Sequence, residues 1–223
     1  MSLRAVIWMS NLTISRSYQT SSSWADVARR IANGADGYLN VKDSLMCSLK
    51  DGTDVQLDVL GVNVYNTNEV IFGFHDLHWN KRMNREHTNA GGWRDSQMRT
   101  ELNDTVLGLL PDDLVEIITP RTIVQRKRGE TFESSDKIWL PSYTEVFGEE
   151  RNMPDVGDIQ FEFFKDKRNR VKFRNGEPPN WWLRSPNVGN STYFWDVSHD
   201  GGCYTSYAGY SNGVSPAFSI CSK

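Results

Sequence analysis

The sequence has few cysteines, no long apolar run and no large excess of charge of either sign. Its three cysteines, Cys47, Cys203 and Cys221, are odd in number and far apart. This usage argues against a secreted scaffold held by disulfides and favours free thiols. The apolar run near the start covers only residues 5–9, too short for a secretory signal, and no run is long enough to span a bilayer. We therefore expect synthesis in the cytoplasm without a signal peptide, and no membrane insertion.

The chain also lacks the basic balance that is typical of nucleic-acid-binding proteins. It has 25 Lys and Arg residues against 28 Asp and Glu residues, and its pI is near 5.8. Basic residues do cluster in Lys165–Arg174, beside Phe163, Phe164 and Phe173. Such interleaving can bind a phosphate backbone. Because acidic stretches flank it, we interpret the cluster as a solvated hairpin, and nucleic acid is not an expected partner.

The most informative absence is local. The stretch Pro186–Ser222 contains no Lys, Arg, Glu, Gln, Met or Leu, yet it holds four tyrosines among many Ser, Gly and Asn residues. This is the composition of a binding surface, since Tyr offers a large amphipathic contact at little entropic cost and the small polar residues offer adaptable hydrogen bonds. The alternative is a β-rich end with half-buried tyrosines. The predicted ligand-contact residues are Asn187, Asn190, Tyr193, His199, Asp200, Tyr204, Ser206, Tyr207, Tyr210, Ser211 and Asn212.

The apolar spacing predicts one or two helices and many short strands, which indicates an α+β domain. Serine hydroxyls precede Trp24 and a stop signal stands at Gly34, so a short amphipathic helix is expected between them. Trp93–Leu110 has the strongest helical pattern and ends at Pro111. Residues 112–124 are ambiguous between helix and strand, and residues 149–179 indicate an insertion or a long hairpin. The predicted strands are Gln56–Val64, Val70–Phe74, Trp181–Ser185 and Gly213–Ile220.

Bulky apolar residues beside the tyrosine-rich stretch are expected to form its framework. The predicted framework residues are Trp181, Trp182, Arg184, Trp195 and Phe218. Arg184 lies in an apolar context and, if buried, needs an acidic or carbonyl partner. The tyrosines at 204, 207 and 210 are spaced by three, which does not suit one face of a strand and favours irregular loop backbone. Residues 1–20 are interpreted as a polar leader and residues 21–223 as one domain.

Several short sequence blocks follow one another in a fairly specific order. They are Trp24–Val27, Asn89–Trp93, Met98–Arg99, Leu102–Asn103, Ile138–Ser142, Glu145–Gly148, Trp181–Pro186, Gly213–Val214 and Pro216–Phe218. In this order they resemble a widespread phage and bacterial domain of unassigned function whose sequences are similar to the C-type lectin and formylglycine-generating-enzyme folds. The resemblance implies a C-type-lectin-like fold, with short mixed or antiparallel sheets and one or two helices. It places the segment at about residues 180–220 on an exposed face.

The same layout is similar to the variable target proteins of diversity-generating retroelements. Those systems mutate template adenines, so an Asn codon becomes a codon for Tyr, Ser, Asp, His, Gly, Thr, Cys, Ala, Val or Phe. Residues 187–212 come almost entirely from that set, and Trp195 departs from it as a framework position would. The resemblance implies a non-enzymatic, hypervariable receptor-binding protein of phage or prophage origin, associated with a virion such as a phage tail. Its expected partner is a protein or glycan on a host or target surface, and homo-oligomer formation is open.

Two alternatives remain. Formylglycine-generating relatives oxidise substrates with two nearby cysteines. Cys203 and Cys221 therefore suggest, as an alternative, an oxidoreductase in which His199 acts as a base. The separation of these cysteines differs from that family, and the segment has no cation to lower a thiol pKa, so we do not expect an enzyme. The other alternative is a structural phage tail component that uses this domain only for assembly.

Metal and cofactor sites are not expected. His75, Asp76, His78 and His87 match no strong zinc spacing. Many lectins bind calcium through a carboxylate and amide pair with Pro between them, but residues 177–180 carry an additional Pro and Asp196 has no neighbouring Asn. Both departures argue against calcium-dependent sugar binding.

Overall fold

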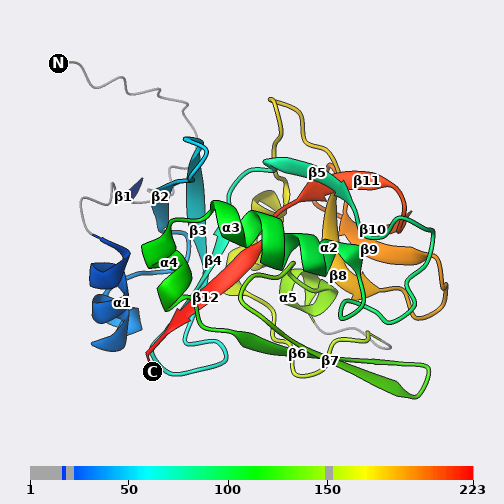
Figure 1. Cartoon of the computed structure of the whole chain (residues 1–223), viewed down its shortest axis with the longest axis horizontal. Helices are drawn as coiled ribbons and strands as arrows, with labels where there is room; N and C mark the ends of the chain where they lie inside the picture. Colours follow the sequence, from blue (N-terminus) through cyan, green and yellow to red (C-terminus); the bar gives the residue numbers. More distant parts are fainter. Residues whose placement is uncertain (1–16, 19–22, 149–152, 223) are drawn as a thin grey trace.

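Two five-stranded sheets and a separate two-stranded hairpin contain the strands of this protein (Figure 1). The computed structural model describes residues 17–18, 23–148 and 153–222. Most strand pairs are antiparallel, and β1–β2 and β8–β11 are parallel. Helices are few and short, so the predicted α+β class is confirmed. Within the described ranges, every helix is too short or too polar to traverse a lipid bilayer.

The first sheet has the order β1-β2-β3-β4-β12. Its interior strand β4 is buried at all six positions because it lies between β3 and β12 and packs against α1. Predicted strands at 56–64 and 70–74 are therefore confirmed, each shifted by a residue or two. The bounds are β1 Ser17–Tyr18, β2 Ser44–Ser48, β3 Asp54–Val62, β4 Glu69–Phe74 and β12 Ala217–Cys221.

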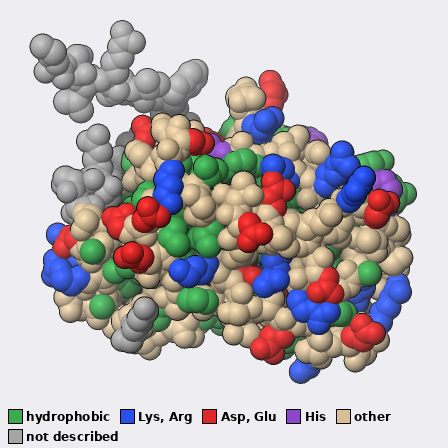
Figure 2. Space-filling view, in the orientation of Figure 1, with side chains coloured by type: hydrophobic (Ala, Val, Ile, Leu, Met, Phe, Trp, Pro, Cys, Tyr) green, Lys and Arg blue, Asp and Glu red, His purple; other side chains and the backbone are tan. Residues whose placement is uncertain are grey.

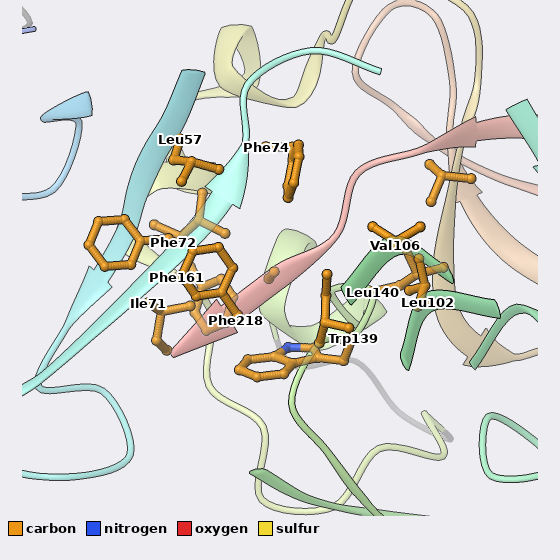
Figure 3. Close-up of a cluster of buried hydrophobic side chains, with 14 of the residues drawn as sticks. Leu57, Ile71, Phe72, Phe74, Leu102, Val106, Trp139, Leu140, Phe161 and Phe218 are labelled. Atoms are coloured by element: carbon orange, nitrogen blue, oxygen red, sulfur yellow. The ribbon is translucent and has the colours of Figure 1, made fainter. Parts of the chain in front are cut away.

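Aromatic rings from this sheet form the centre of the core. Phe72 and Phe218 stack with their centroids 5.5 Å apart, and Trp24 contacts Phe72 edge-on at 6.4 Å. Figure 3 shows Leu57, Phe72 and Phe218 in one part of the buried core, and Leu102 and Val106 in another part. Burial of such rings is the main favourable term in folding.

The first predicted helix is present as α1, Trp24–Ala32. Ser23 is its N-cap, and the Ser23 hydroxyl accepts a hydrogen bond from the backbone N–H of Asp26. Trp24, Val27 and Ile31 form its buried face, as the spacing predicts. The helix ends before Gly34, which adopts a φ of 135° that other residues rarely tolerate.

The second predicted helix begins later than its apolar pattern suggests. Gly91 and Gly92 have positive φ and carry Trp93 into a turn, so the helix starts only after the Ser96 N-cap. The Asn103 side chain donates to the carbonyls of Arg99 and Ile138, where the helix widens into a π-helical turn. The three segments are α2 Gln97–Glu101, η2 Leu102–Val106 and α3 Leu107–Leu109.

Residues 112–147 contain two helices and two strands that the apolar patterns did not predict. Residues 112–117 are helical and residues 121–127 form a strand that pairs with the next one through a turn at Arg128 and Gly129, both with positive φ. A capping box between Ser142 and Glu145 then starts a further helix. The bounds are α4 Asp112–Ile117, β6 Arg121–Lys127, β7 Glu130–Asp136 and α5 Tyr143–Phe147.

The predicted hairpin is wrong, but most of the basic side chains are solvated as expected. The segment forms two 3₁₀ turns, η3 Glu162–Lys165 and η4 Lys167–Arg170, and the rings of Phe163 and Phe164 are buried. The buried Lys172 ammonium donates to the carbonyls of Phe74 and His75 at 2.5 and 3.0 Å. These residues pack the segment against the end of β4, while Lys165, Lys167, Arg168 and Arg174 remain exposed.

The second sheet has the order β10-β9-β8-β11-β5, so β10 and β5 are its edges. The predicted strand at 213–220 is two strands, because the chain leaves one sheet at Val214 and enters the other at Ala217. Pro216 stands between them and has no N–H to continue a ladder. Figure 1 shows this crossing from β11 to β12. The bounds are β5 Trp79–Arg82, β8 Trp181–Pro186, β9 Tyr193–Val197, β10 Cys203–Tyr207 and β11 Ser211–Val214.

A buried ionic network secures β8. One Arg184 nitrogen donates to Glu145 at 2.6 Å and to the Leu140 carbonyl at 2.8 Å, and another contacts Asp158. Arg121 bridges the same two acids, at 2.7 Å for Asp158. Burial alone raises the pKa of Glu145, but the two guanidinium groups reverse this and hold it at about 2. The predicted ion pair of Arg184 is therefore present.

Candidate ligand-binding surface

Burial falls steadily across three neighbouring strands of the second sheet. All six residues of β8 are buried, β9 mixes buried and half-buried residues, and no residue of β10 is buried. Because β10 is an edge strand, one side of its backbone and most of its side chains meet solvent. Tyr204 is 59% exposed and Tyr210, just beyond the strand, is 54% exposed.

Three tyrosines and one histidine form an aromatic cluster at one end of β10. Tyr193 and Tyr207 are directly opposite each other in the β9–β10 ladder, and their ring centroids are 4.5 Å apart. Tyr207 also contacts Tyr210 at 5.2 Å and His87 at 4.8 Å. A hydrogen bond with Tyr207 raises the pKa of the Tyr193 phenol. The rings therefore pack mainly on one another at the surface, and not within the core.

The backbone beneath this aromatic cluster is more regular than the sequence suggests. The prediction of irregular loop backbone is wrong for Tyr204 and Tyr207, which lie in an unbroken five-residue ladder. The two side chains project to opposite faces of the strand. Tyr210 lies in the following turn, where Gly209 donates its N–H to His87 at 3.2 Å. A Cβ at Gly209 would be only 2.7 Å from His87, so glycine is needed for close approach.

A buried carboxylate supports the same strand from its other face. Asp196 accepts hydrogen bonds from the Ser206 hydroxyl at 2.5 Å and from the Asn212 amide at 2.8 Å. Burial raises the pKa of Asp196 to about 6. Ser206 and Asn212 were both predicted as ligand contacts, and the structure makes them partners of the framework as well. An Asp among the apolar residues of β9 was the signal for this role.

The loop between β8 and β9 is held by its own asparagines. The Asn187 side chain accepts from the N–H groups of Gly189 and Asn190 at 2.9 and 3.1 Å. The buried Asn89 amide donates to the carbonyls of Asn187, Asn190 and Tyr193 at 2.7–2.9 Å. Asn89 belongs to a block that carried the family resemblance, but its role as a loop clamp was not predictable from sequence.

The remaining predicted contacts are divided between the two ends of β10. His199 and Asp200 are exposed in the β9–β10 turn, at the far end of the strand from the aromatic cluster. Asp200 accepts from the Ser198 hydroxyl and pairs with Lys167 at 3.2 Å, which holds its pKa well below the usual range. Ser211 is exposed at the start of β11, beside the aromatic cluster. The structure thus brings most, but not all, of the predicted contacts together.

A hollow of about 360 Å³ adjoins the surface at Ser211. Among its lining residues, Lys81 pairs with Glu101, while Arg82 and Arg85 add further positive charge. Sequence reasoning missed these residues because they come from β5, the loop after it and α2, far from Ser211 in the chain. The hollow is lined by Asn80, Lys81, Arg82, Arg85, Gln97, Glu101 and Ser211.

The predicted framework residues lie behind this surface. Trp181, Trp182, Arg184 and Phe218 are fully buried. Trp195 is partly buried and contacts the Tyr143 ring at a centroid distance of 4.8 Å. Its packing on α5 agrees with a fixed position in the sheet.

Other candidate chemistries are dispersed. His75, His78 and His87 have separate partners, and the described part of the chain contains no group of three His, Cys, Asp or Glu residues arranged to hold a metal ion. Cys203 is exposed on β10, whereas Cys221 ends β12 in the other sheet. Arg170 lies close enough to Cys203 for a Coulombic interaction, so a cation reaches this thiol from outside the tyrosine-rich segment.

The geometry defines an α+β protein whose second sheet carries an exposed aromatic edge on a buried framework. Residues 65–222 match the family described as Domain of unknown function (DUF6273), and the chain belongs to this family. No curated protein and no solved structure matches the chain. The family range includes the whole second sheet, while β2 and β3 precede it and β3 pairs with β4 inside it.

Proposed function

We propose that this protein is a non-enzymatic ligand-binding protein that uses β10 and the adjoining loops as its contact surface. The observation that carries the proposal is the difference in burial between two strands. Every residue of β8 is buried, whereas every residue of β10 is exposed or half-buried. A buried framework fixes the position of side chains that are themselves free to contact a partner. The aromatic cluster is already packed, so binding orders few additional rotamers.

The proposed partner is a macromolecule on a host or target surface, either a protein or a glycan. Tyrosines on an edge strand form a broad face, and the adjoining hollow, at about 360 Å³, lies near the lower end of the range of small-ligand pockets. Tyr and Arg are the residues that most often dominate binding energy at such faces. On the side of the molecule seen in Figure 2, acidic and basic side chains are interspersed, which agrees with specific contact better than with general charge attraction.

The proposed origin is a phage or prophage variable protein with a C-type-lectin-like fold, diversified by a retroelement. The residues of the asparagine-codon set include the exposed Tyr204, Tyr210 and Ser211, where change would leave the core intact. Trp195, outside that set, packs on α5. A near-copy of the coding stretch for residues 181–220 that differs only at adenines, next to a reverse-transcriptase gene, would support this origin. Flanking DNA without either would contradict it.

Binding is tested with fluorescently labelled protein on intact cells of the strain that carries the gene, measured by flow cytometry. We expect saturable binding that falls at least tenfold in Tyr207→Ala and Tyr210→Ala. Phe173→Ala is the matched control, because Phe173 is 45% exposed and lies outside the proposed surface. Equal binding by all three variants would place the contact elsewhere. Absence of saturable binding to these cells would contradict a host-surface receptor and favour an assembly role.

A further inference from the structure

A second cavity, remote from β10, lies between the first sheet and the two 3₁₀ turns. Its volume is about 180 Å³, which suits a group of a few heavy atoms better than a drug-sized ligand. Apart from the ring of Phe163, its lining is polar or charged. The lining residues are Lys42, Ser44, Gln56, Asp58, His75, Phe163 and Asn169.

An aspartate and a histidine form an oriented pair in this cavity. His75 Nδ1 lies 2.7 Å from Asp58 Oδ2, while the other Asp58 oxygen accepts from Ser44 and Gln56, both at 2.9 Å. Asp58 is only 3% exposed, but the His75 side chain is 47% exposed. The carboxylate is therefore fully engaged behind the imidazole. This arrangement fixes the ring and leaves Nε2 as its polar atom for a ligand.

The charges around His75 favour its protonated form. The hydrogen bond to Asp58 raises the pKa of His75, Asp76 acts in the same direction, and the buried Lys172 opposes them. Lys172 in turn helps to keep Asp58 ionised, and burial lowers the pKa of Lys172 to about 8. An imidazolium in this position donates from Nε2 to an acceptor outside the Asp58 pair.

Lys42 supplies a second cation in a backbone conformation that does not favour lysine. Its φ is 79°, in the region where Gly and Asn are usual, and its N–H is committed to the Val59 carbonyl at 3.1 Å. Gly would fit this turn with less strain. A residue held in such a conformation beside a cavity suggests that its side chain has a role.

We propose that this cavity binds a small oxyanion of the phosphate-monoester class between the His75 imidazolium and the Lys42 ammonium. Asp58 is the carboxylate among the lining residues, and its oxygens accept from His75, Ser44 and Gln56. It pairs with the His75 imidazolium and leaves Nε2 as a donor, so the Lys42 ammonium has no carboxylate partner of its own in the lining. Charge-assisted hydrogen bonds from an imidazolium and an ammonium are strong and suit a phosphate. Phe163 leaves an apolar wall against which the organic part of an ester can lie.

The test uses inorganic phosphate as the probe, at constant ionic strength, with the histidine ring resonances followed by NMR. We expect a saturable shift of the His75 resonance with a millimolar Kd, and weaker binding as pH rises through the pKa of His75. The exposed His199 serves as the internal reference and should move only slightly. A sulfate titration of the same size tests whether recognition extends to other oxyanions. Equal responses of His75 and His199 would overturn the proposal.

Two variants test the roles of the cations. His75→Gln should abolish saturable phosphate binding, as read from the amide resonances around the cavity. Lys42→Gly should weaken it about tenfold without lowering Tm, because glycine is compatible with the positive φ. Unchanged phosphate affinity in Lys42→Gly would remove Lys42 from the site. If His75→Gln does not fold, Lys42→Gly and the His75 titration still decide the proposal.

Discussion

Two strands of the same sheet, β8 and β10, have opposite relations to the rest of the molecule. They are separated only by β9, yet β8 is buried throughout and β10 is not buried at any position. Trp181, Trp182 and Arg184 of β8 contact the core and the ionic network. Tyr207 of β10 contacts other surface rings. This difference in burial shows that one sheet can hold residues that determine stability on one strand and residues available for recognition on another.

The largest effect is expected from Arg184→Ala. This change leaves the buried Glu145 and Asp158 with only one of their two guanidinium partners, and loss of one member of a buried ion pair typically costs about 3–5 kcal/mol. Urea unfolding measures the loss. Lys167→Ala is the control, because it removes an exposed ion pair with Asp200 at the β10 end of the sheet, where about 0–1 kcal/mol is expected. Equal losses in the two variants would break the distinction between the strands.

Asp196→Asn should have the next largest effect, and the size of this effect depends on pH. The pKa of Asp196 is about 6 in the folded protein against 3.8 as the reference value. The folded state therefore binds this proton more tightly, so the contribution of Asp196 to stability rises as pH falls from 7 to about 4.

Replacing the carboxylate removes its ionisation cost, so Asp196→Asn should be more stable than the wild type by about 3 kcal/mol at pH 7. The gain should vanish near pH 4. Urea unfolding at both pH values measures it. A variant that is less stable at pH 7 would show that the ionised carboxylate stabilises the sheet.

Ser206→Ala should have a smaller effect, and it tests where the boundary between the regions lies. Ser206 belongs to β10 but donates to Asp196, so its loss should cost about 1 kcal/mol at pH 7. Thr205→Ala is the matched control, since the neighbouring side chain projects from the opposite face of the strand. Thermal unfolding of the two variants gives the comparison. A larger loss of stability in Thr205→Ala would show that the strand is stabilised from the Thr205 face and not from the face that contacts Asp196.

The smallest effect on stability is expected from alkylation of Cys203. This thiol is exposed on β10, whereas Cys47 is buried and its pKa is raised to about 12 by burial. Iodoacetamide at pH 8 should therefore modify Cys203 first and leave Tm nearly unchanged, while Cys47 reacts only after unfolding. Mass spectrometry of timed samples measures the order. Early modification of Cys47 would show that the first sheet opens more readily than the edge of the second.

Local patterns predicted the elements whose burial is simple. The spacing of Trp24, Val27 and Ile31 identified α1, and continuous apolar residues identified β4 and β8. The framework role of Phe218 and the ion pair of Arg184 also followed from residue chemistry. These features depend on side-chain type and on contacts that any well-packed core must provide.

Other features depend on tertiary context that a local pattern does not contain. The division of the predicted 213–220 strand requires knowledge that two sheets meet at Pro216. The aromatic cluster includes His87, more than a hundred residues before Tyr207, and no spacing rule connects them. The basic segment is not the predicted hairpin, because Phe163, Phe164 and Lys172 are buried against distant parts of the chain. Predictions failed mainly where distant segments supply the partner.

The most direct test of the account is the thermal stability of the combined variant Tyr204→Ala, Tyr207→Ala and Tyr210→Ala. Because Tyr207 and Tyr210 contact each other and His87 at the surface, and Tyr204 is exposed on the other face of β10, we expect a cooperative transition with Tm within a few degrees of the wild type. Arg184→Ala, measured alongside, should unfold at a much lower temperature. A loss of stability in the tyrosine variant as large as that in Arg184→Ala would contradict the separation of surface and framework.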